Sequence, residues 1–219
     1  MTVYRLTKKL AFPPPELADD DGLLAVGGDL SVNRLVLAYS MGIFPWSSDD
    51  TPILWWSPDP RPVIFPGRLK IPRTLRQTMK KGIFRITTNA AFEDVIRNCA
   101  TISRKGQDGT WINHDMIEAY IRLHKAGYAH SVEAWDGDEL AGGLYGIILG
   151  RAFFGESMFA KKSDASKVAF ATYALTLAEK GFELIDCQVT TAHMKRFGAV
   201  EISREEFMNH LQKALHVEA

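Results

Sequence analysis

Residues 130–159 read HSVEAWDGDELAGGLYGIILGRAFFGESMF and predict a meander of three strands. The strands are expected over His130–Trp135, Leu140–Leu149 and Ala152–Phe159, because runs rich in β-branched and aromatic residues are separated there by short turns. The first turn is Asp-Gly-Asp and the second is Gly-Arg. Strands joined by such short turns pair in antiparallel fashion.

Further helices and strands are predicted on both sides of the meander. Downstream, the expected elements are a helix over Asp164–Lys180, a strand over Glu183–Val189 and a helix over Arg204–Leu215. Upstream, they are strands over Leu23–Val26, Val63–Phe65 and Ile83–Thr88, a helix capped by Asp29 or Ser31 that ends near Met41, and helices over Arg68–Lys81, Phe92–Ala100 and Met116–Ala126. This order indicates an α+β layer fold rather than alternating βαβ units.

The first 60 residues differ in composition from the remainder of the chain. They contain seven of the ten prolines and three of the five tryptophans. Residues 53–62 are especially rich in proline, which argues against regular β-ladders and predicts a linker. We therefore expect a small N-terminal domain over residues 1–60 and a second domain over residues 61–219.

The overall composition is that of an ordinary globular protein, with 46% hydrophobic and 24% charged residues. The longest apolar stretch, Leu140–Gly150, is much shorter than the roughly 20 residues that a membrane helix needs. Residues 1–5 show no signal peptide, and Cys99 and Cys187 match neither a disulfide framework nor a metal motif. We expect a cytoplasmic protein that spans no membrane and keeps both thiols reduced.

Charge is unevenly distributed along the chain, although the formal net charge is zero. Residues 60–92 contain no Asp or Glu, so the remainder of the chain has an acidic excess. The basic residues of this stretch are Arg61, Arg68, Lys70, Arg73, Arg76, Lys80, Lys81 and Arg85. Such a segment forms either a solvated face or a surface for a polyanion such as a nucleic acid.

Polar residues interrupt two otherwise apolar predicted strands. In Glu183–Val189, the alternation of side chains places Asp186 and Gln188 on one face, about 6.6 Å apart. In the last strand of the meander, Glu156 follows Gly155, which suggests a bulge or a close approach. Buried polar groups need partners. These residues therefore mark either a pocket with polar anchors or core groups satisfied by loop backbone and, for Glu156, by a lysine.

Two tryptophans, Trp46 and Trp111, lie in loop-like contexts. They are either lids on the core or stacking platforms for a nucleobase. The histidines and cysteines lack metal-ligand spacing, so no metal site is expected. The sequence also lacks the glycine-rich phosphate loops and the serine-hydrolase elbow, which counts against ATP-driven, nicotinamide-dependent and serine-hydrolase chemistry.

Seven segments together resemble the leucyl/phenylalanyl-tRNA–protein transferase family. They are GLLAVGGDLS (22–31), GIFPW (42–46), ILWWSPDPR (53–61), GTWI (109–112), GESMF (155–159), DASK (164–167) and LIDCQ (184–188). The resemblance covers about residues 3–212. It implies a small N-terminal domain, a C-terminal domain similar to the GNAT acetyltransferase fold, and a bacterial enzyme of the N-end rule. Such an enzyme moves Leu or Phe, and less well Met, from aminoacyl-tRNA to the α-amino group of proteins that begin with Arg or Lys, which marks them for degradation.

The resemblance also implies roles for individual residues. Trp46 and Trp111 would sandwich the terminal adenine of the tRNA, and Glu156, with Gly155 beside it, would anchor a polar group of the aminoacyl-adenosine. The pocket for the aminoacyl side chain would consist of Phe153, Met158 and Ile185, with Leu144, Phe170 and Tyr173 as further lining. The all-basic stretch from Arg61 to Arg85 would grip the tRNA acceptor stem, and the tRNA-binding residues expected from it are Arg73, Arg76, Lys80, Lys81 and Arg85.

The implied reaction is aminolysis of an activated ester, which requires neither ATP nor a metal nor another cofactor. Asp186 and Gln188 are then the catalytic candidates. Either both relay a proton from the amine, or Asp186 orients the cationic N-terminal residue while the substrate's ribose hydroxyl carries the proton. One departure is Thr191, where the family often has Asn, whereas His193 is present as in the family.

Two other functions compete with this one. An acyl-CoA-dependent GNAT acyltransferase would present a glycine-containing loop to the pyrophosphate, and residues 161–166 contain no glycine. A non-catalytic RNA-binding module would explain the basic segment, but it gives no role to Asp186, Gln188 and Glu156 together.

Overall fold

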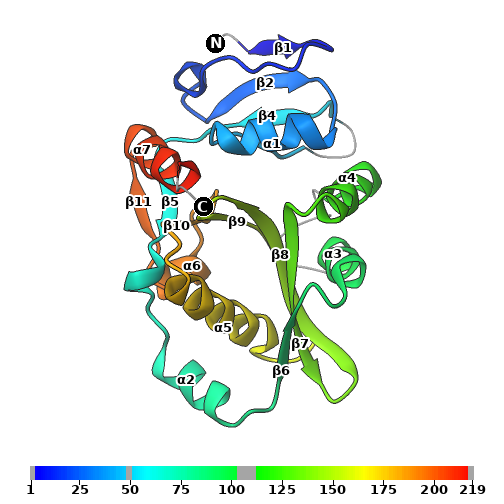
Figure 1. Ribbon diagram of the computed structural model, residues 1–219, viewed down its shortest axis with the longest axis vertical. Helices are drawn as coiled ribbons and strands as arrows, with labels where there is room; N and C mark the ends of the chain where they lie inside the picture. Colours follow the sequence, from blue (N-terminus) through cyan, green and yellow to red (C-terminus); the bar gives the residue numbers. More distant parts are fainter. Residues whose placement is uncertain (1–2, 48–50, 103–111, 217–219) are drawn as a thin grey trace.

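The computed structural model describes residues 3–47, 51–102 and 112–216. They form two β-sheets with helices packed around them (Figure 1), so the predicted α+β class is confirmed. The smaller sheet has the strand order β1-β2-β4-β3, and the larger has the order β11-β5-β10-β9-β8-β7-β6.

The smaller sheet takes all its strands from the first 56 residues. Its strands are β1 (Tyr4–Leu6), β2 (Leu23–Gly27), β3 (Phe44–Pro45) and β4 (Leu54–Trp56), and a 3-10 turn, η1 (Pro15–Leu17), lies between β1 and β2. The helix that follows β2 is α1 (Val32–Ser40). Ser31 is its N-cap, because the Ser31 hydroxyl accepts a hydrogen bond from the Arg34 N–H.

The larger sheet is built around the predicted meander, which is confirmed. Its strands are β5 (Arg61–Ile64), β6 (Arg85–Thr88), β7 (Ala129–Asp136), β8 (Glu139–Leu149), β9 (Ala152–Ala160), β10 (Leu184–Asp186) and β11 (Val200–Ile202). β7, β8 and β9 pair in antiparallel fashion, whereas β10 runs parallel to β9. Its helices are α2 (Arg73–Lys80), α3 (Phe92–Thr101), α4 (His114–Lys125), α5 (Ala165–Glu179), α6 (Ala192–Arg196) and α7 (Arg204–Leu215).

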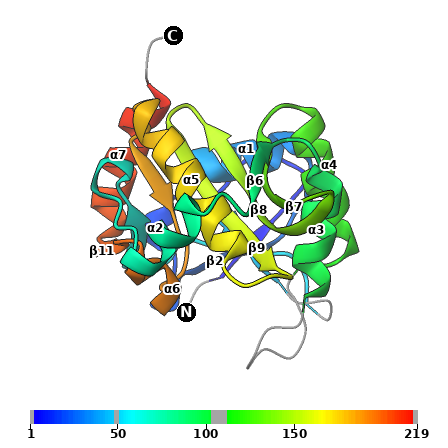
Figure 2. The same cartoon turned by 90° about the horizontal axis from the view of Figure 1, so that it is seen from below.

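A hydrophobic core lies on each face of the larger sheet. One core contains side chains of α2 and α5, and the other contains side chains of α1, α3, α4 and α7. Figures 1 and 2 show α5 on one side of the central strands and α3 and α4 on the other. The second core continues into the smaller sheet, since Leu24 and Trp55 belong to it together with Phe154. The two sheets therefore share one apolar interior. That residues 1–60 fold as a separate domain stays a prediction.

The proline-rich residues 53–62 are not a linker, contrary to the prediction. They contain β4 and the start of β5, and β5 lies inside the larger sheet between β10 and β11. Pro62 is tolerated there because it occupies the position at which the ladder with β10 ends.

The helix expected over Arg68–Lys81 is shorter in the structure. Residues Pro66–Arg68 form a 3-10 turn, and α2 begins only at Arg73, with Pro72 as its N-cap residue. A proline disfavours helical dihedral angles in the residue before it, so a helix cannot run smoothly through Pro72. Within the described residues, no helix is long and apolar enough to span a membrane.

Candidate active site

The strand that carries Asp186 ends earlier than predicted, and this places Gln188 in a turn. β10 stops at Asp186, where Cys187 would pair next with Pro62. The Cys187 N–H donates to the Pro62 carbonyl at 3.0 Å, but Pro62 has no N–H to return the bond. The Cys187 carbonyl instead accepts from the Val189 N–H at 2.6 Å.

This bond closes a three-residue turn with Gln188 at its centre, at φ +59°. A non-glycine residue in this left-handed conformation is strained by about 1–3 kcal/mol. The prediction that Asp186 and Gln188 share one strand face is therefore wrong. A tight turn brings the two residues together, and the strain indicates that surrounding contacts hold Gln188 in place.

Asp186 is fixed by a buried ion pair with Arg61. The guanidinium donates from Nε to Oδ1 at 2.8 Å and from Nη2 to Oδ2 at 2.7 Å, and neither residue is more than 1% exposed. Arg61 also donates from Nη1 to the Gly42 carbonyl, and its guanidinium lies 4.7 Å from the ring centres of Phe44 and Phe207. Arg61 therefore lies inside the protein and does not belong to a tRNA-binding surface, contrary to the prediction for the whole basic stretch.

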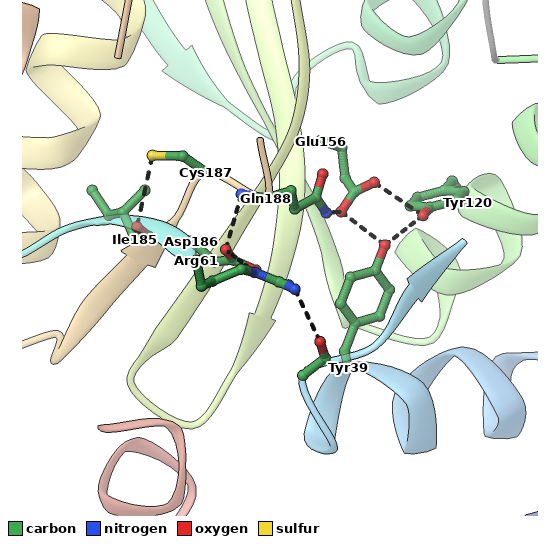
Figure 3. A network of polar contacts seen from close by, with 9 residues as sticks. Tyr39, Arg61, Tyr120, Glu156, Ile185, Asp186, Cys187 and Gln188 are labelled. Atoms are coloured by element: carbon green, nitrogen blue, oxygen red, sulfur yellow. Dashed lines mark hydrogen bonds and ion pairs between the residues drawn. The ribbon is translucent and has the colours of Figure 1, made fainter. Parts of the chain in front are cut away.

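Asp186 also holds the backbone of the turn. Its Oδ1 accepts a hydrogen bond from the Gln188 backbone N–H at 2.9 Å. The partners of the carboxylate are thus a guanidinium and a backbone amide, so its hydrogen bonds are charge-assisted. Figure 3 shows Asp186 between Arg61 and the start of the turn.

Glu156 projects from a β-bulge in β9. Tyr145 pairs with Ser157 and Gly146 pairs with Gly155, so Glu156 is the extra residue between them. The bulge predicted next to Gly155 is confirmed. A bulge redirects a side chain out of the regular alternation of the strand, and here it directs the carboxyl group toward Gln188 (Figure 3).

The Glu156 carboxyl has three partners, and none is the lysine considered from the sequence. Oε1 accepts from the Tyr39 hydroxyl at 2.7 Å and from Gln188 Nε2 at 2.7 Å, and Oε2 lies within hydrogen-bond distance of the Tyr120 hydroxyl, at 3.1 Å. Burial raises the pKa of the Glu156 carboxyl to about 7, although the three hydrogen bonds favour the charged form. The nearby Asp186 carboxylate raises this pKa further.

These residues line a cavity with a volume of about 490 Å³. The predicted site residues among its lining are Trp46, Leu144, Phe153, Gly155, Glu156, Met158, Phe170, Ile185, Asp186 and Gln188. Tyr173 is not among the lining residues, although its ring packs edge-on against that of Phe153 at a centroid distance of 5.3 Å. Trp111 lies outside the described residues. The cavity therefore has an apolar wall that faces the polar groups of Glu156 and Gln188.

Trp46 lies at the edge of the cavity and is 38% exposed. Its backbone carbonyl accepts from Trp56 Nε1 at 2.7 Å, and the two indole rings are tilted at a centroid distance of 6.1 Å. The backbone is thus anchored while part of the ring remains open to solvent. A nucleobase can stack on such an exposed indole ring.

Thr191 and His193 also line the cavity. Thr191 is the N-cap of α6, because its Oγ1 accepts from the Met194 N–H at 3.1 Å. Asn and Thr both serve as N-caps, so the departure at Thr191 preserves the cap. His193 packs edge-on against Phe197, and burial lowers the pKa of its imidazole, which favours the neutral ring.

Three residues of the site gave no signal in the sequence: Arg61, Tyr39 and Tyr120. Arg61 was counted with the basic stretch, and the two tyrosines occupy apolar stripes of predicted helices. A buried tyrosine normally needs a partner for its hydroxyl group, and that requirement could have pointed to Tyr39 and Tyr120.

The predicted tRNA-binding residues are all exposed. They are Arg73, Arg76 and Lys80 on α2, Lys81 after it, and Arg85 at the start of β6. α2 lies at the end of the molecule away from the smaller sheet (Figure 1). Among the described residues, no cluster of His, Cys, Asp and Glu could hold a metal ion.

Comparison with known proteins identifies the family to which this chain belongs. Residues 63–212 match the model of the leucyl/phenylalanyl-tRNA protein transferases, and residues 28–59 match the model of their N-terminal domain. The chain belongs to this family. A leucyl/phenylalanyl-tRNA–protein transferase of Anaeromyxobacter sp. (strain Fw109-5) is 60% identical over 98% of this chain and 92% of the relative. The protein of the same name from Syntrophobacter fumaroxidans is 60% identical over 95% of this chain and 89% of the relative.

The resemblance seen in the sequence is thereby confirmed, and the chain is a transferase that acts with aminoacyl-tRNA on proteins. Among solved structures, L-PGS from Bacillus licheniformis aligns with 90% of this transferase and 74% of its own chain, at a TM-score of 0.45 and 9% identity. The GNAT-like architecture of residues 61–219 stays a prediction.

Proposed function

We propose that this transferase moves Leu or Phe, and less well Met, from aminoacyl-tRNA to the α-amino group of proteins that begin with Arg or Lys. The observation that supports this most is the cavity itself, in which an apolar wall faces Gln188 and Glu156. An apolar pocket accepts Leu, Phe and Met, and it separates them only weakly because one methylene group is worth about 1–3 kcal/mol.

The two substrates would meet in this cavity from different sides. The aminoacyl side chain would contact Phe153, Met158 and Ile185, and the terminal adenine would stack on Trp46. Trp111, outside the described residues, is the proposed second stacking ring. The acceptor N-terminus would approach past residues 189–191, which form part of the lining.

The reaction needs little besides positioning. The acceptor nitrogen attacks the ester carbonyl carbon, a C–N bond forms, the bond to the ribose oxygen breaks, and the proton of the amine ends on that oxygen. An α-amino group has a pKa of about 7.7–8.0, so roughly a tenth is already neutral at pH 7. Holding this amine against the ester accounts for much of the acceleration that is needed.

Gln188 is the residue that we place against the amine. Its Nε2 already donates to Glu156, so the remaining carboxamide oxygen is the atom that can accept an N–H from the attacking group.

Asp186 would act by placing Gln188. Its charge is matched by Arg61, and it has no exposed surface, which argues against a direct role as base or as an anchor for a cationic N-terminus. We therefore favour the scheme in which the ribose hydroxyl carries the proton. In our version of it, Asp186 is a positioning residue and does not contact the cationic N-terminal residue.

The exposed basic residues on α2 would contact the tRNA backbone without reading its sequence. The product would carry an N-terminal Leu, Phe or Met and act as an N-end rule degradation signal. Because charged tRNA is a cytoplasmic substrate, we place this activity in the cytoplasm.

The test is transfer of radiolabelled Leu from Leu-tRNA to a peptide that begins with Arg, without ATP or CoA. An otherwise identical peptide that begins with Ala is the matched control. Labelling of the Arg peptide alone is expected. Labelling of both peptides would contradict the acceptor rule, and labelling of neither, despite measurable tRNA binding, would contradict the reaction.

A further inference from the structure

Tyr39, Tyr120 and Glu156 form a closed triangle of polar contacts. The Tyr39 and Tyr120 hydroxyl oxygens are 2.5 Å apart, and each also contacts one carboxyl oxygen of Glu156, at 2.7 Å and 3.1 Å. Both tyrosines are completely buried, and Glu156 is 9% exposed. The hydrogen-bond partners of these three groups must therefore lie within the protein.

The number of protons decides the charge state that fits this triangle. Two tyrosine hydroxyls supply two protons, so an ionised Glu156 leaves one of the three edges without a proton. Whichever edge lacks the proton, two oxygens 2.5–3.1 Å apart then face each other without a hydrogen bond and repel each other. A neutral Glu156 supplies the third proton, and then every edge is a hydrogen bond.

We propose that Glu156 works as the neutral carboxylic acid, and that its closed ring of hydrogen bonds with Tyr39 and Tyr120 positions the Gln188 carboxamide for the attacking amine. This inference rests on the proposed function. Tyr39 and Tyr120 are positioning residues, since they act through Glu156 and Gln188.

The bond directions in the ring follow from the partners of each atom. Oε1 of Glu156 faces two groups, the Tyr39 hydroxyl and Gln188 Nε2, and Nε2 can only donate. Oε1 is therefore the carbonyl oxygen, and Oε2 carries the proton and donates it to Tyr120. Tyr120 then donates to Tyr39, and Tyr39 donates to Oε1. This order makes Oε1 the acceptor that holds Gln188.

The surroundings favour the neutral acid. Asp186 is the nearby carboxylate, and its charge is directed to Arg61. Tyr145 packs edge-on against Tyr120 at a centroid distance of 5.6 Å, and none of the ion pairs found in the described residues includes Glu156.

Burial supports the same protonation pattern. It raises the pKa of the Glu156 carboxyl to about 7, and it raises the pKa values of Tyr39 and Tyr120 well above the ordinary value, so both phenols keep their protons. Desolvation also raises the pKa of the half-buried Cys187 thiol, which adds no charge.

The ring joins distant parts of the chain. Tyr39 comes from α1 beside the smaller sheet, Tyr120 from α4, and Glu156 from the bulge in β9. The N-terminal part of the enzyme thus contributes a hydroxyl group that stabilises the active-site carboxamide.

Glu156→Gln tests the proposal, because a carboxamide reproduces the neutral acid. Its oxygen can accept from Tyr39 and Gln188, and its NH₂ group can donate to Tyr120 in place of the Oε2 proton. In the Leu transfer assay, we expect Glu156→Gln to keep kcat within about threefold of the unmodified enzyme. We expect Glu156→Ala, which removes the ring, to lose about a hundredfold.

A second measurement is independent of catalysis. The carboxyl ¹³C resonance of Glu156 in enzyme labelled at glutamate, assigned by its absence in Glu156→Gln, should titrate near pH 7. Circular dichroism and thermal melting confirm that both variants are folded. If the unmodified enzyme fails to transfer Leu, the proposed function is wrong while the titration still reports the protonation of Glu156.

Three results would overturn the inference. The first is an equal loss of kcat in Glu156→Gln and Glu156→Ala when both proteins are folded. The second is retention of kcat in both variants. The third is a Glu156 carboxyl that stays ionised as the pH is lowered to the ordinary pKa of glutamate. The first would make the charged carboxylate the working form, the second would remove its positioning role, and the third would exclude the neutral acid.

Discussion

The buried pair of Arg61 and Asp186 carries the first prediction at the scale of single residues. Arg61→Ala leaves the Asp186 carboxylate without its counter-ion in a site with no exposed surface. Removing one partner of a buried ion pair costs about 3–5 kcal/mol. We expect the free energy of unfolding, measured by urea denaturation, to fall by this amount.

Arg68→Ala is the matched control, since Arg68 is exposed and its guanidinium lies over Phe65. It should change the free energy of unfolding by less than about 1 kcal/mol. Similar losses in both variants would mean that the Arg61–Asp186 pair contributes no more than a surface arginine.

Glu156 makes stability depend on pH, and the sign follows from its raised pKa. The carboxyl titrates at about 4.3 when unfolded and at about 7 when folded, so the folded protein holds the proton more tightly. The resulting stabilisation is complete below about pH 4.3 and is lost as pH rises through 7. It is about 4 kcal/mol at most.

Urea denaturation of the unmodified enzyme and of Glu156→Gln, at a series of pH values between 4 and 8, measures this contribution. The stability of the unmodified enzyme relative to the variant should decline as pH rises across that interval. A constant difference between the two proteins would show that the carboxyl titrates alike in the folded and unfolded states.

At the scale of single elements, the turn after β10 depends on a proline in a neighbouring strand. Pro62→Ala restores an N–H that can donate to the Cys187 carbonyl, and this carbonyl now closes the turn around Gln188. We expect the ladder to extend and Gln188 to leave its left-handed conformation. In the Leu transfer assay, kcat should fall by about tenfold or more, because the carboxamide is displaced.

Pro66→Ala is the control, because Pro66 lies in the 3-10 turn after β5 rather than in the ladder. A Pro62→Ala enzyme with normal kcat would indicate that the turn does not depend on the missing donor.

Helix α6 carries a further prediction at this scale. Thr191→Asn should keep the cap and leave the melting temperature and kcat close to those of the unmodified enzyme. Thr191→Ala removes the cap and should lower stability by about 0.5–2 kcal/mol. A large change of kcat or of acceptor preference in Thr191→Asn would instead show that the hydroxyl contacts the substrate.

The elements that the sequence predicted well are those governed by local pattern. The meander and α7 are confirmed because alternation, turns and helical periodicity act within a few residues. The end of β10 could not be predicted in this way, since it depends on Pro62, which is distant in the sequence. The burial of Arg61 has the same origin, because its partner Asp186 is supplied by another strand.

At the scale of the whole molecule, the candidate site joins residues from both parts of the chain. Tyr39 reaches Glu156 from α1, and Arg61 donates to the Gly42 carbonyl while it holds Asp186. Both contacts start or end in the first 60 residues. The predicted domain boundary near residue 60 therefore separates residues that contact each other directly in the candidate site.

The distribution of charge over the molecule gives the last prediction. Arg76 and Lys80 are exposed on α2, in a segment without acidic residues, and we place them on tRNA phosphates. Each phosphate contact contributes about 0.9 to the slope of log K against log salt concentration. The double variant Arg76→Ala/Lys80→Ala should therefore weaken tRNA binding at low salt and reduce this slope by about 2, for any tRNA sequence.

The same substitutions at Arg122 and Lys125 on α4, which are also exposed, should leave the slope unchanged. Equal reductions in both double variants would show that the effect follows net charge, and a reduction only in the α4 variant would move the tRNA surface to that helix.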